Sequence, residues 1–244
     1  MIHFFKKARK KFAATDRPFK YLSYAIGEIV LVVIGILIAL QINNWNENRK
    51  LEKEELELLR GVKVNLETTL ANFRADTIYN AKSILFYKRI QHYIEADLPY
   101  SNDLDSCFGN LTFWNSPFTI TTSYKTLQTK GLDLIKNEKL RNKIVEMFEF
   151  EAVILIEYYD KSEWNINESI STPFFAKHIE RLDGGSLDLA RPNDFEKLKH
   201  DPEFTNLLSM LIRQRKKGIE YYTLAMVFIQ DLINEIDMEV NSRI

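Results

Sequence analysis

An apolar segment, unbroken from Ile29 to Leu40, constrains this chain more than any other feature of its sequence. Residues 25–42 read AIGEIVLVVIGILIALQI, which approaches the roughly 20 residues that a helix needs to cross a bilayer. Lipid offers no hydrogen-bond partners to backbone amides, so such a segment must be helical. Tyr21, Tyr24 and Trp45 flank the run and suit the two membrane interfaces. A buried core helix is the alternative, but soluble helices rarely lack a polar face over such a length.

The charges that flank the run predict its orientation. Residues 1–20 are rich in Lys and Arg and contain one acid, Asp16, whereas both signs are mixed directly after Trp45. Because positively charged flanks stay in the cytoplasm, we expect residues 1–20 to be a basic cytoplasmic leader and residues 21–45 a transmembrane signal anchor. A cleaved signal peptide is the competing interpretation. It would need a small-residue cleavage site, and residues 38–42 do not supply one.

The charge balance limits the classes of partner. The leader carries +6 and Glu28 carries −1, so the total of −1 leaves −6 on residues 43–244. This acidic balance argues against nucleic acid as a partner. The lipid bilayer is the partner that the sequence supports most directly.

Four anchor residues are candidates for contact inside the membrane: Glu28, Gly35, Ala39 and Gln41. Glu28 lies near the cytoplasmic end, where its carboxylate can reach the headgroups or contact a second helix. Gly35 and Ala39 form a small-xxx-small pair, which lets helices approach closely. These positions point to a protein partner or to a homo-oligomer.

Residues 46–244 are predicted to form one helical domain. The chain has only 8 Gly and 6 Pro, so turns are few. Apolar residues recur at helical spacing from Leu59 to Ile94, which predicts that the anchor helix continues outward. We expect an all-α fold in which a single N-terminal transmembrane helix continues into an antiparallel helical bundle.

Local signals predict where the other helices begin and end. A short helix is expected near residues 123–130, with Gly131 as its C-cap, and a long one from the N-cap Asn137 to residue 164 or 170. Ser171-Thr172-Pro173 is expected to interrupt it. Gly184-Gly185 and Arg191-Pro192 mark a loop, and Asp201-Pro202-Glu203 begins the last helix.

Residues 95–120 are expected to be irregular, and their aromatic residues allow two interpretations. Phe108, Phe113, Trp114 and Phe118 either line a pocket or cap the open end of the bundle, and we favour the cap. Cys107 is the only cysteine, and we expect it to be a small buried residue.

The sequence contains no recognisable motif for catalysis, metal binding or phosphate binding. The four His are scattered without zinc-ligand spacing, and no phosphate-binding or nucleophile motif occurs. We therefore expect no enzyme, with no catalytic residue, no cofactor and no metal.

Two blocks of the sequence carry a resemblance. Residues 24–50, YAIGEIVLVVIGILIALQINNWNENRK, and residues 123–144, SYKTLQTKGLDLIKNEKLRNKI, resemble an uncharacterised family of Gram-negative bacterial single-pass membrane proteins. The resemblance implies an inner-membrane protein whose domain, residues 46–244, faces the periplasm. It implies no activity.

Two functions remain open. The first is a non-enzymatic interaction or scaffold protein, in which the anchor tethers a periplasmic helical domain. The second is a periplasmic ligand-binding sensory domain, which would signal through a partner because 20 cytoplasmic residues are too few for an output domain.

Overall fold

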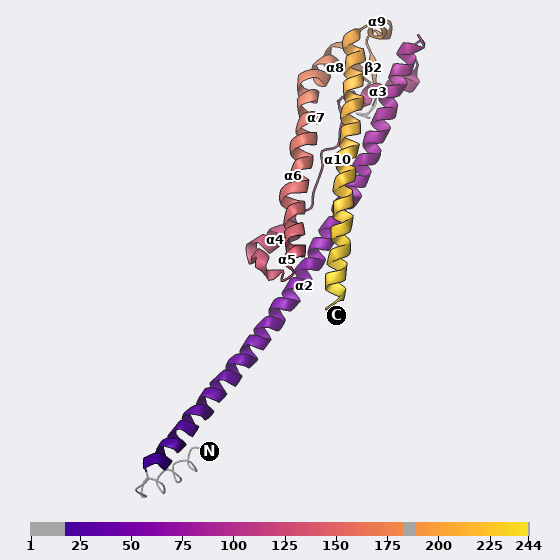
Figure 1. Cartoon of the computed structure of the whole chain (residues 1–244). Coiled ribbons are helices and arrows are strands. Elements are labelled where there is room, and N and C mark those ends of the chain that lie inside the picture. Colours follow the sequence, from indigo (N-terminus) through magenta and orange to yellow (C-terminus); the bar gives the residue numbers. More distant parts are fainter. Residues whose placement is uncertain (1–17, 183–188, 244) are drawn as a thin grey trace. The chain divides into compact units, whose positions relative to one another are not determined.

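The computed structural model describes residues 18–182 and 189–243 (Figure 1). The expected leader, residues 1–20, lies almost wholly outside the described residues, and so does Gly184-Gly185. The chain divides into two compact units, Met1–Glu55 and Leu56–Ile244. We call the second unit the helical domain.

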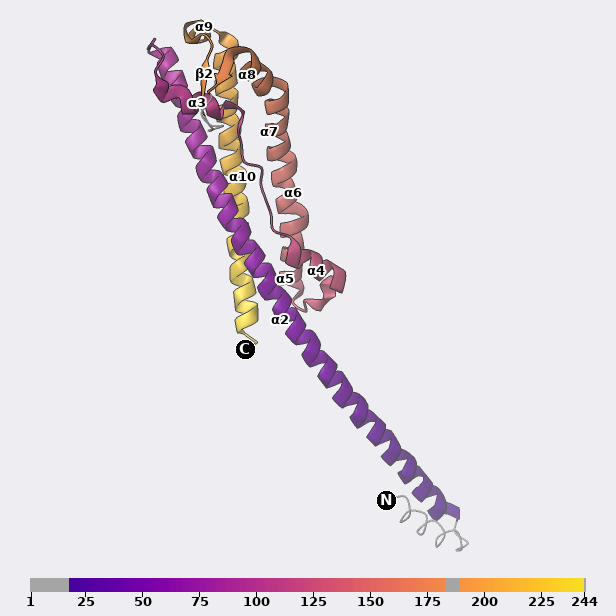
Figure 2. The ribbon, with the colours of Figure 1, turned by 180° about the vertical axis from the view of Figure 1, so that it is seen from behind.

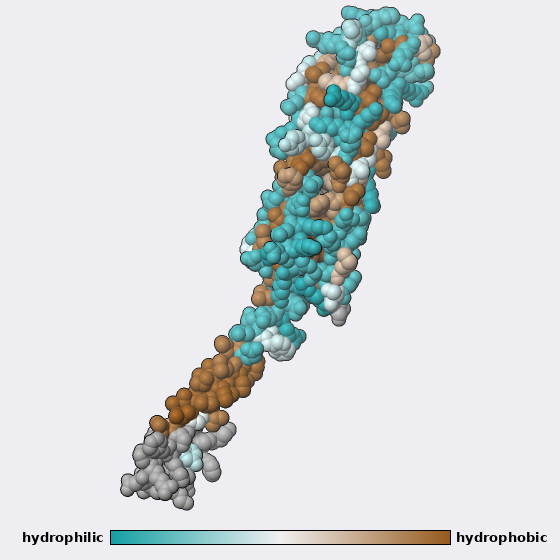
Figure 3. Space-filling view, viewed as in Figure 1, coloured by the Kyte–Doolittle hydropathy of each residue, from teal (hydrophilic) through white to brown (hydrophobic). Residues whose placement is uncertain are grey.

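The described residues of the first unit form the N-terminal part of helix α2, which spans Pro18–Glu95. By length and composition this part is apolar enough to cross a membrane, and its apolar side chains are exposed rather than buried against the chain. Figure 3 shows a continuous hydrophobic surface over this stretch. The hydrocarbon interior of a lipid bilayer is the environment that such a surface fits.

The helical domain consists almost entirely of helices. After α2 the chain forms three short helical turns and an extended segment, residues 113–121. The elements that follow are mostly helical and end in the long helix α10 (Figure 1). Their bounds are η1 Asn102–Leu104, α3 Asp105–Gly109, η2 Asn110–Thr112, α4 Thr122–Lys130, η3 Leu132–Leu134, α5 Glu138–Glu146, η4 Met147–Glu151, α6 Ala152–Ile154, η5 Leu155–Asp160, α7 Lys161–Ile166, η6 Asn167–Ser171, α8 Thr172–His178, α9 Phe195–Lys199 and α10 Pro202–Asn241.

Side-chain contacts give the directions of the long helices. Lys63 of α2 contacts Asp237, and Gln91 contacts Ser209, so α2 and α10 are antiparallel. The stretch α5–α8 is also antiparallel to α10, and it is therefore parallel to α2; the contacts are Lys143 with Glu235 and Glu163 with Arg215.

This arrangement differs from the fully antiparallel bundle that the sequence predicts. The reason is the extended segment, residues 113–121, which runs back along the domain between α2 and the α5–α8 stretch (Figure 2). It returns the chain without a helix, so the next long helix starts at the same end as α2.

Residues 138–178 form one nearly continuous helical stretch that alternates between α and π turns. Most of its buried residues recur in steps of four with a single step of three: Leu140, Ile144, Phe148, Ala152, Leu155, Tyr159, Glu163, Ser171 and Phe175, with partly buried Asn167 completing the series. Buried Met147 and Phe174 lie directly beside members of this series. An α-helix turns once in 3.6 residues, so this spacing would rotate away from the core. The π-helical segments η4, η5 and η6 add residues to the turn and keep the series inward.

The expected interruption at Ser171-Thr172-Pro173 is therefore wrong. The helical stretch continues through it to His178. Pro173 is the second residue of α8, directly after the π segment η6, and the backbone before it stays helical.

The predicted caps are confirmed. Gly131 ends α4 with a φ of 105°, a conformation that L side chains rarely adopt. The side chain of Asn137 accepts from the amide of Leu140, and Asp201 accepts from the amide of Glu203. These caps satisfy amides that the helices leave free.

A two-stranded antiparallel sheet interrupts the otherwise all-α fold. Strand β1, Ile179–Arg181, pairs with β2, Ala190–Pro192, with Ile179 opposite Pro192. Arg191-Pro192 was expected in a loop, and this prediction is wrong because both residues lie in strand β2. Pro192 is tolerated because each strand of a two-stranded sheet is an edge.

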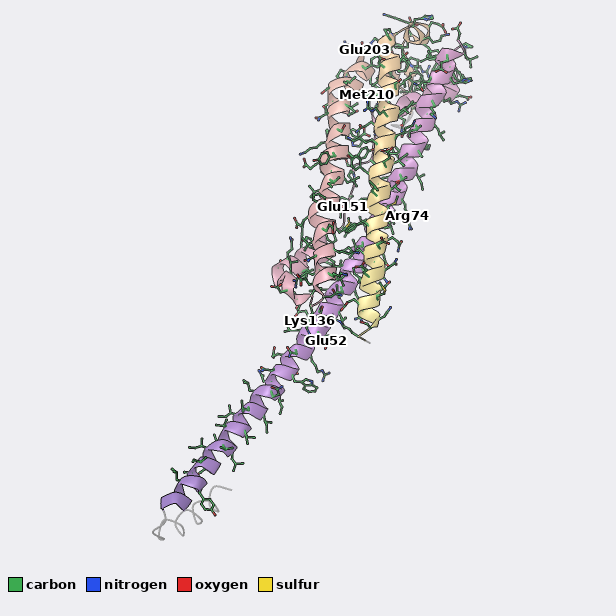
Figure 4. All side chains as sticks on the ribbon, in the orientation of Figure 1. Glu52, Arg74, Lys136, Glu151, Glu203 and Met210 are labelled. Atoms are coloured by element: carbon green, nitrogen blue, oxygen red, sulfur yellow. The ribbon has the colours of Figure 1, made fainter. Side chains whose placement is uncertain are left out.

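The buried apolar residues form two core clusters. The first joins α2 between Leu59 and Phe73 to α4, to the stretch from α5 to η5, and to α10 from Tyr222 onward. The second joins Tyr87 and Ile90 of α2 to α3, α8, the sheet and the start of α10. Glu203 and Met210, labelled in Figure 4, lie at the α10 end nearest the second cluster.

Residues 95–120 are not wholly irregular, because η1, α3 and η2 lie within them. Cys107 is buried in the second cluster, as predicted. The aromatic residues do not form one cap. Phe108 is buried in the second cluster, Trp114 packs on Trp164, and Phe118 is exposed.

Candidate functional site

Three of the four predicted anchor residues share one face of α2. Because an α-helix turns about 100° per residue, Gly35 and Ala39 lie within about 20° of Glu28 around the helix axis. Gln41 follows Glu28 by about three and a half turns and therefore lies on the opposite side. Glu28, Gly35 and Ala39 can thus meet one neighbouring helix, whereas Gln41 cannot meet it at the same time.

The helical domain contains a buried polar layer that lies between the two core clusters. On each long helix the polar residues fall where one cluster stops and the other begins. Its members are Asp76, Asn80, Ser83 and Tyr87 from α2, Asn110 from η2, Tyr159, Glu163 and Ser171 from the α5–α8 stretch, and Gln214 and Arg215 from α10.

An ion pair lies at the centre of the layer. The Nη1 of Arg215 donates to Oε1 of Glu163, and the two side chains are each 2% exposed. The Nη2 of Arg215 donates to the carbonyl of Phe113 at 2.7 Å. Burial raises the pKa of Glu163, and the charge of Arg215 partly offsets this rise. The pair connects α10 to α7 and to the start of the extended segment.

Tyr159 connects the layer to α2. Its hydroxyl accepts from Nδ2 of Asn80 at 3.0 Å, and its ring lies directly on Gly218. A Cβ at position 218 would come within 2.5 Å of Cζ of Tyr159. Only glycine therefore fits there without a shift of the ring.

A second polar group holds the extended segment against α2. Nδ2 of Asn115 donates to Oδ1 of Asp76 at 3.0 Å, and the hydroxyl of Tyr222 donates to the Asn115 carbonyl at 3.4 Å. Burial raises the pKa of Asp76, and the hydrogen bond from Asn115 opposes the rise. These contacts fix the path of the return segment.

Some polar atoms of the layer lack a hydrogen-bond partner among the described residues. They are Oγ of Ser83, Oδ1 of Asn110, Oγ of Ser171 and Nε of Arg215. Buried polar atoms are normally paired, so this group can accept and donate further hydrogen bonds. Among the residues that the structure describes, no group of three or more His, Cys, Asp or Glu is arranged to hold a metal ion.

Sequence reasoning missed this polar layer, although one signal for it exists. The apolar stripe of α10 runs through Leu208 and Leu211 and resumes at Tyr222, and Gln214, Arg215 and Gly218 occupy the core positions between. Polar residues at core positions of an apolar stripe indicate buried partners. The partner residues lie on other helices, and the stripe itself does not reveal which residues they are.

These observations define a class: a helical domain with a buried polar layer, carried on a helix long and apolar enough to cross a membrane. The family model of the family of unknown function DUF6090 matches residues 28–201, and the chain belongs to this family. The resemblance to an uncharacterised family is thereby confirmed, while a Gram-negative source stays a prediction. No curated protein and no solved structure matches the chain.

Proposed function

We propose that this protein is a non-enzymatic interaction or scaffold protein of the bacterial inner membrane. Residues 1–20 lie in the cytoplasm, residues 21–45 cross the membrane once, and the helical domain binds a protein partner in the periplasm. The orientation rests on the basic leader and on the mixed charges after Trp45.

One observation carries this proposal: the helical domain exposes large apolar side chains well beyond the anchor. Phe118 is 66% exposed, Phe150 57% and Tyr158 60%. Figure 3 shows hydrophobic patches at mid-length of the domain, over the α5–α8 stretch and α10. Clustered apolar and aromatic side chains at a protein surface mark interaction sites.

The buried polar layer suits a binding frame better than a reaction site. Its ionised side chains are paired inside the protein and hold three helices and the return segment in one arrangement. A fixed frame lowers the entropy that a surface loses when it binds a partner.

Topology and partner binding can be tested separately. A C-terminal alkaline phosphatase fusion should be active, and a C-terminal GFP fusion that requires the cytoplasm should be dark. Crosslinking of the full chain in intact membranes should then yield a stoichiometric protein partner after purification. The opposite fusion pattern contradicts the orientation, and a full chain purified without any partner contradicts the scaffold role.

A ligand-binding sensory domain is the second candidate, and the polar layer favours it. Four buried polar atoms in the layer have spare hydrogen-bonding capacity, and one of them, Oγ of Ser171, lies in the π-helical segment η6. Such segments occur frequently at functional sites. Native mass spectrometry of the purified full chain separates the two functions, because a retained small molecule supports the sensory domain.

A further inference from the structure

The side of the α6–α7 stretch that borders the return segment combines apolar and acidic side chains. We call it the α6–α7 face and define it by Val153, Ile156, Glu157, Asp160, Trp164 and Glu168. Two contacts fix its direction. Nε1 of Trp114 donates to Oδ1 of Asp160 at 3.0 Å, and the rings of Trp114 and Trp164 lie 5.3 Å apart at 82°.

The face carries three partly exposed apolar side chains. Val153 is 43% exposed, Ile156 40% and Trp164 50%. Exposed Phe118 lies on the return segment that passes beside this stretch (Figure 2). Large apolar side chains gathered on so short a stretch leave apolar area in water, which a partner would remove.

Trp164 is held in place before any partner arrives. The Trp114 ring packs edge-on against it, and the carboxylate of Asp160 fixes the Trp114 ring by its hydrogen bond. Tryptophan is enriched among the residues that dominate binding energy. A ring that is already ordered loses little entropy on binding.

The charges around the face are strongly one-sided. Residues 146–170 contain seven acids and one base, Lys161. Lys161 is already paired with Glu157, and Glu163 is the one acid of the seven that is turned inward, to Arg215. The stretch therefore presents a negative field around apolar anchors.

This combination selects among possible occupants. An anionic lipid surface or a nucleic acid would be repelled by the acids. A second copy that used the same face would set these acids against each other. A polypeptide with Lys or Arg beside apolar residues would cover the apolar side chains of the face and pair with its acids at the same time.

We propose that the α6–α7 face docks a cationic amphipathic helix of another protein. The apolar residues of that helix cover Ile156 and Trp164, and its Lys or Arg side chains reach Glu157, Asp160 and Glu168. Ile156 and Trp164 are eight residues apart, about 12 Å along a helix, which two turns of the partner can span. This inference rests on the proposed function and names the chemistry of its partner.

Peptide binding to the full chain tests the proposal. The chain is placed in phosphatidylcholine nanodiscs, with empty nanodiscs as the blank. Two labelled amphipathic peptides serve as probes, one of Leu and Lys and one in which Glu replaces Lys. The variants are Ile156→Ser and the pair Glu157→Gln with Glu168→Gln. Matched controls on exposed sites of α10 are Leu224→Ser and Glu220→Gln.

We expect the Lys peptide to bind at least about tenfold more tightly than the Glu peptide, and the affinity to fall as salt is added. Each face variant should weaken binding about fivefold, and each control less than twofold. Equal affinity for both peptides, no saturable binding, or equal losses in the controls would overturn the proposal. So would self-association of the chain, or binding to phosphatidylglycerol vesicles, that the face variants abolish.

A second readout separates this inference from the proposed function. If the membrane crosslinking experiment yields a partner that the face variants retain in full, the chain is an interaction protein that uses another surface. If it yields no partner with any variant, the proposed function itself fails.

Discussion

The ion pair between Arg215 and Glu163 allows a quantitative test of the polar layer. Glu163→Leu removes the carboxylate and leaves the guanidinium buried, with the Phe113 carbonyl and the Tyr87 side chain as its remaining hydrogen-bond partners. Removing one member of a buried pair costs about 3–5 kcal/mol, because the other charge stays out of water. Since Arg215 is only 1% exposed, we expect a value in the upper half of that range.

The double variant Glu163→Leu with Arg215→Met removes both charges. The apolar replacements recover packing, but the Phe113 carbonyl loses its donor, which costs about 1–3 kcal/mol. We therefore expect the double variant to be about 1–2 kcal/mol less stable than the wild type and clearly more stable than Glu163→Leu. The pair then has a coupling free energy of at least about 2 kcal/mol.

Urea unfolding of the full chain in detergent, followed by tryptophan fluorescence, measures these free energies. Leu224→Ser, at an exposed site on α10, is the control and should change stability by less than about 0.5 kcal/mol. If Glu163→Leu and the double variant lose the same stability, or if the single variant is neutral, the assignment of a buried, coupled pair is refuted.

Three further predictions follow from the local geometry. In Arg215→Met, burial keeps the pKa of Glu163 above its ordinary value of 4.5, and no cation offsets the rise. The contribution of Glu163 to stability should therefore be fully present below pH 4.5 and be lost as pH rises through the raised pKa, which a pH series of urea midpoints, compared with the wild type, checks. Asp201→Ala removes the acceptor for the amide of Glu203 and should cost about 1 kcal/mol in the same assay, whereas Asp201→Asn should retain most of it. Gly131→Ala places a side chain at a φ of 105° and should cost about 1–2 kcal/mol although the surrounding space is open; an unchanged urea midpoint would show that the backbone relaxes there.

The features that the sequence predicted correctly are local. The caps at Gly131, Asn137 and Asp201 depend only on residues a few positions away, so the neighbouring sequence is enough to predict them. The apolar stripe of α2 from Leu59 onward is also local, because helical spacing alone defines it.

The direction of the long helices could not be predicted, because it depends on the return segment. Residues 113–121 look like a loop, and nothing local shows that they run along the domain. Their path depends on distant partners, such as Asp76 for Asn115 and Asp160 for Trp114. The direction of the α5–α8 stretch follows from that path.

The π-helical segments were missed for a different reason. The buried positions from Leu140 to Phe175 have a period close to four residues, and this spacing is visible in the sequence. Taken as an α-helix, such a series drifts around the axis. The interruption at Ser171-Thr172-Pro173 was predicted from a different signal, the proline, which usually ends a helix. A period longer than 3.6 residues indicates a wider turn.

The polar layer also explains why this domain has one register. If α10 slid by one turn, Leu211 would replace Arg215 opposite Glu163, and a buried carboxylate would lose its cation. The same slip would move Gly218 away from the Tyr159 ring and bring a side chain against it. The apolar clusters alone oppose such a slip less strongly, because many of their α10 residues four positions apart are aliphatic, such as Leu207 and Leu211, or Ile229 and Ile233. We infer that the polar layer excludes it, and that it thereby fixes which side chains of the α6–α7 stretch face outward.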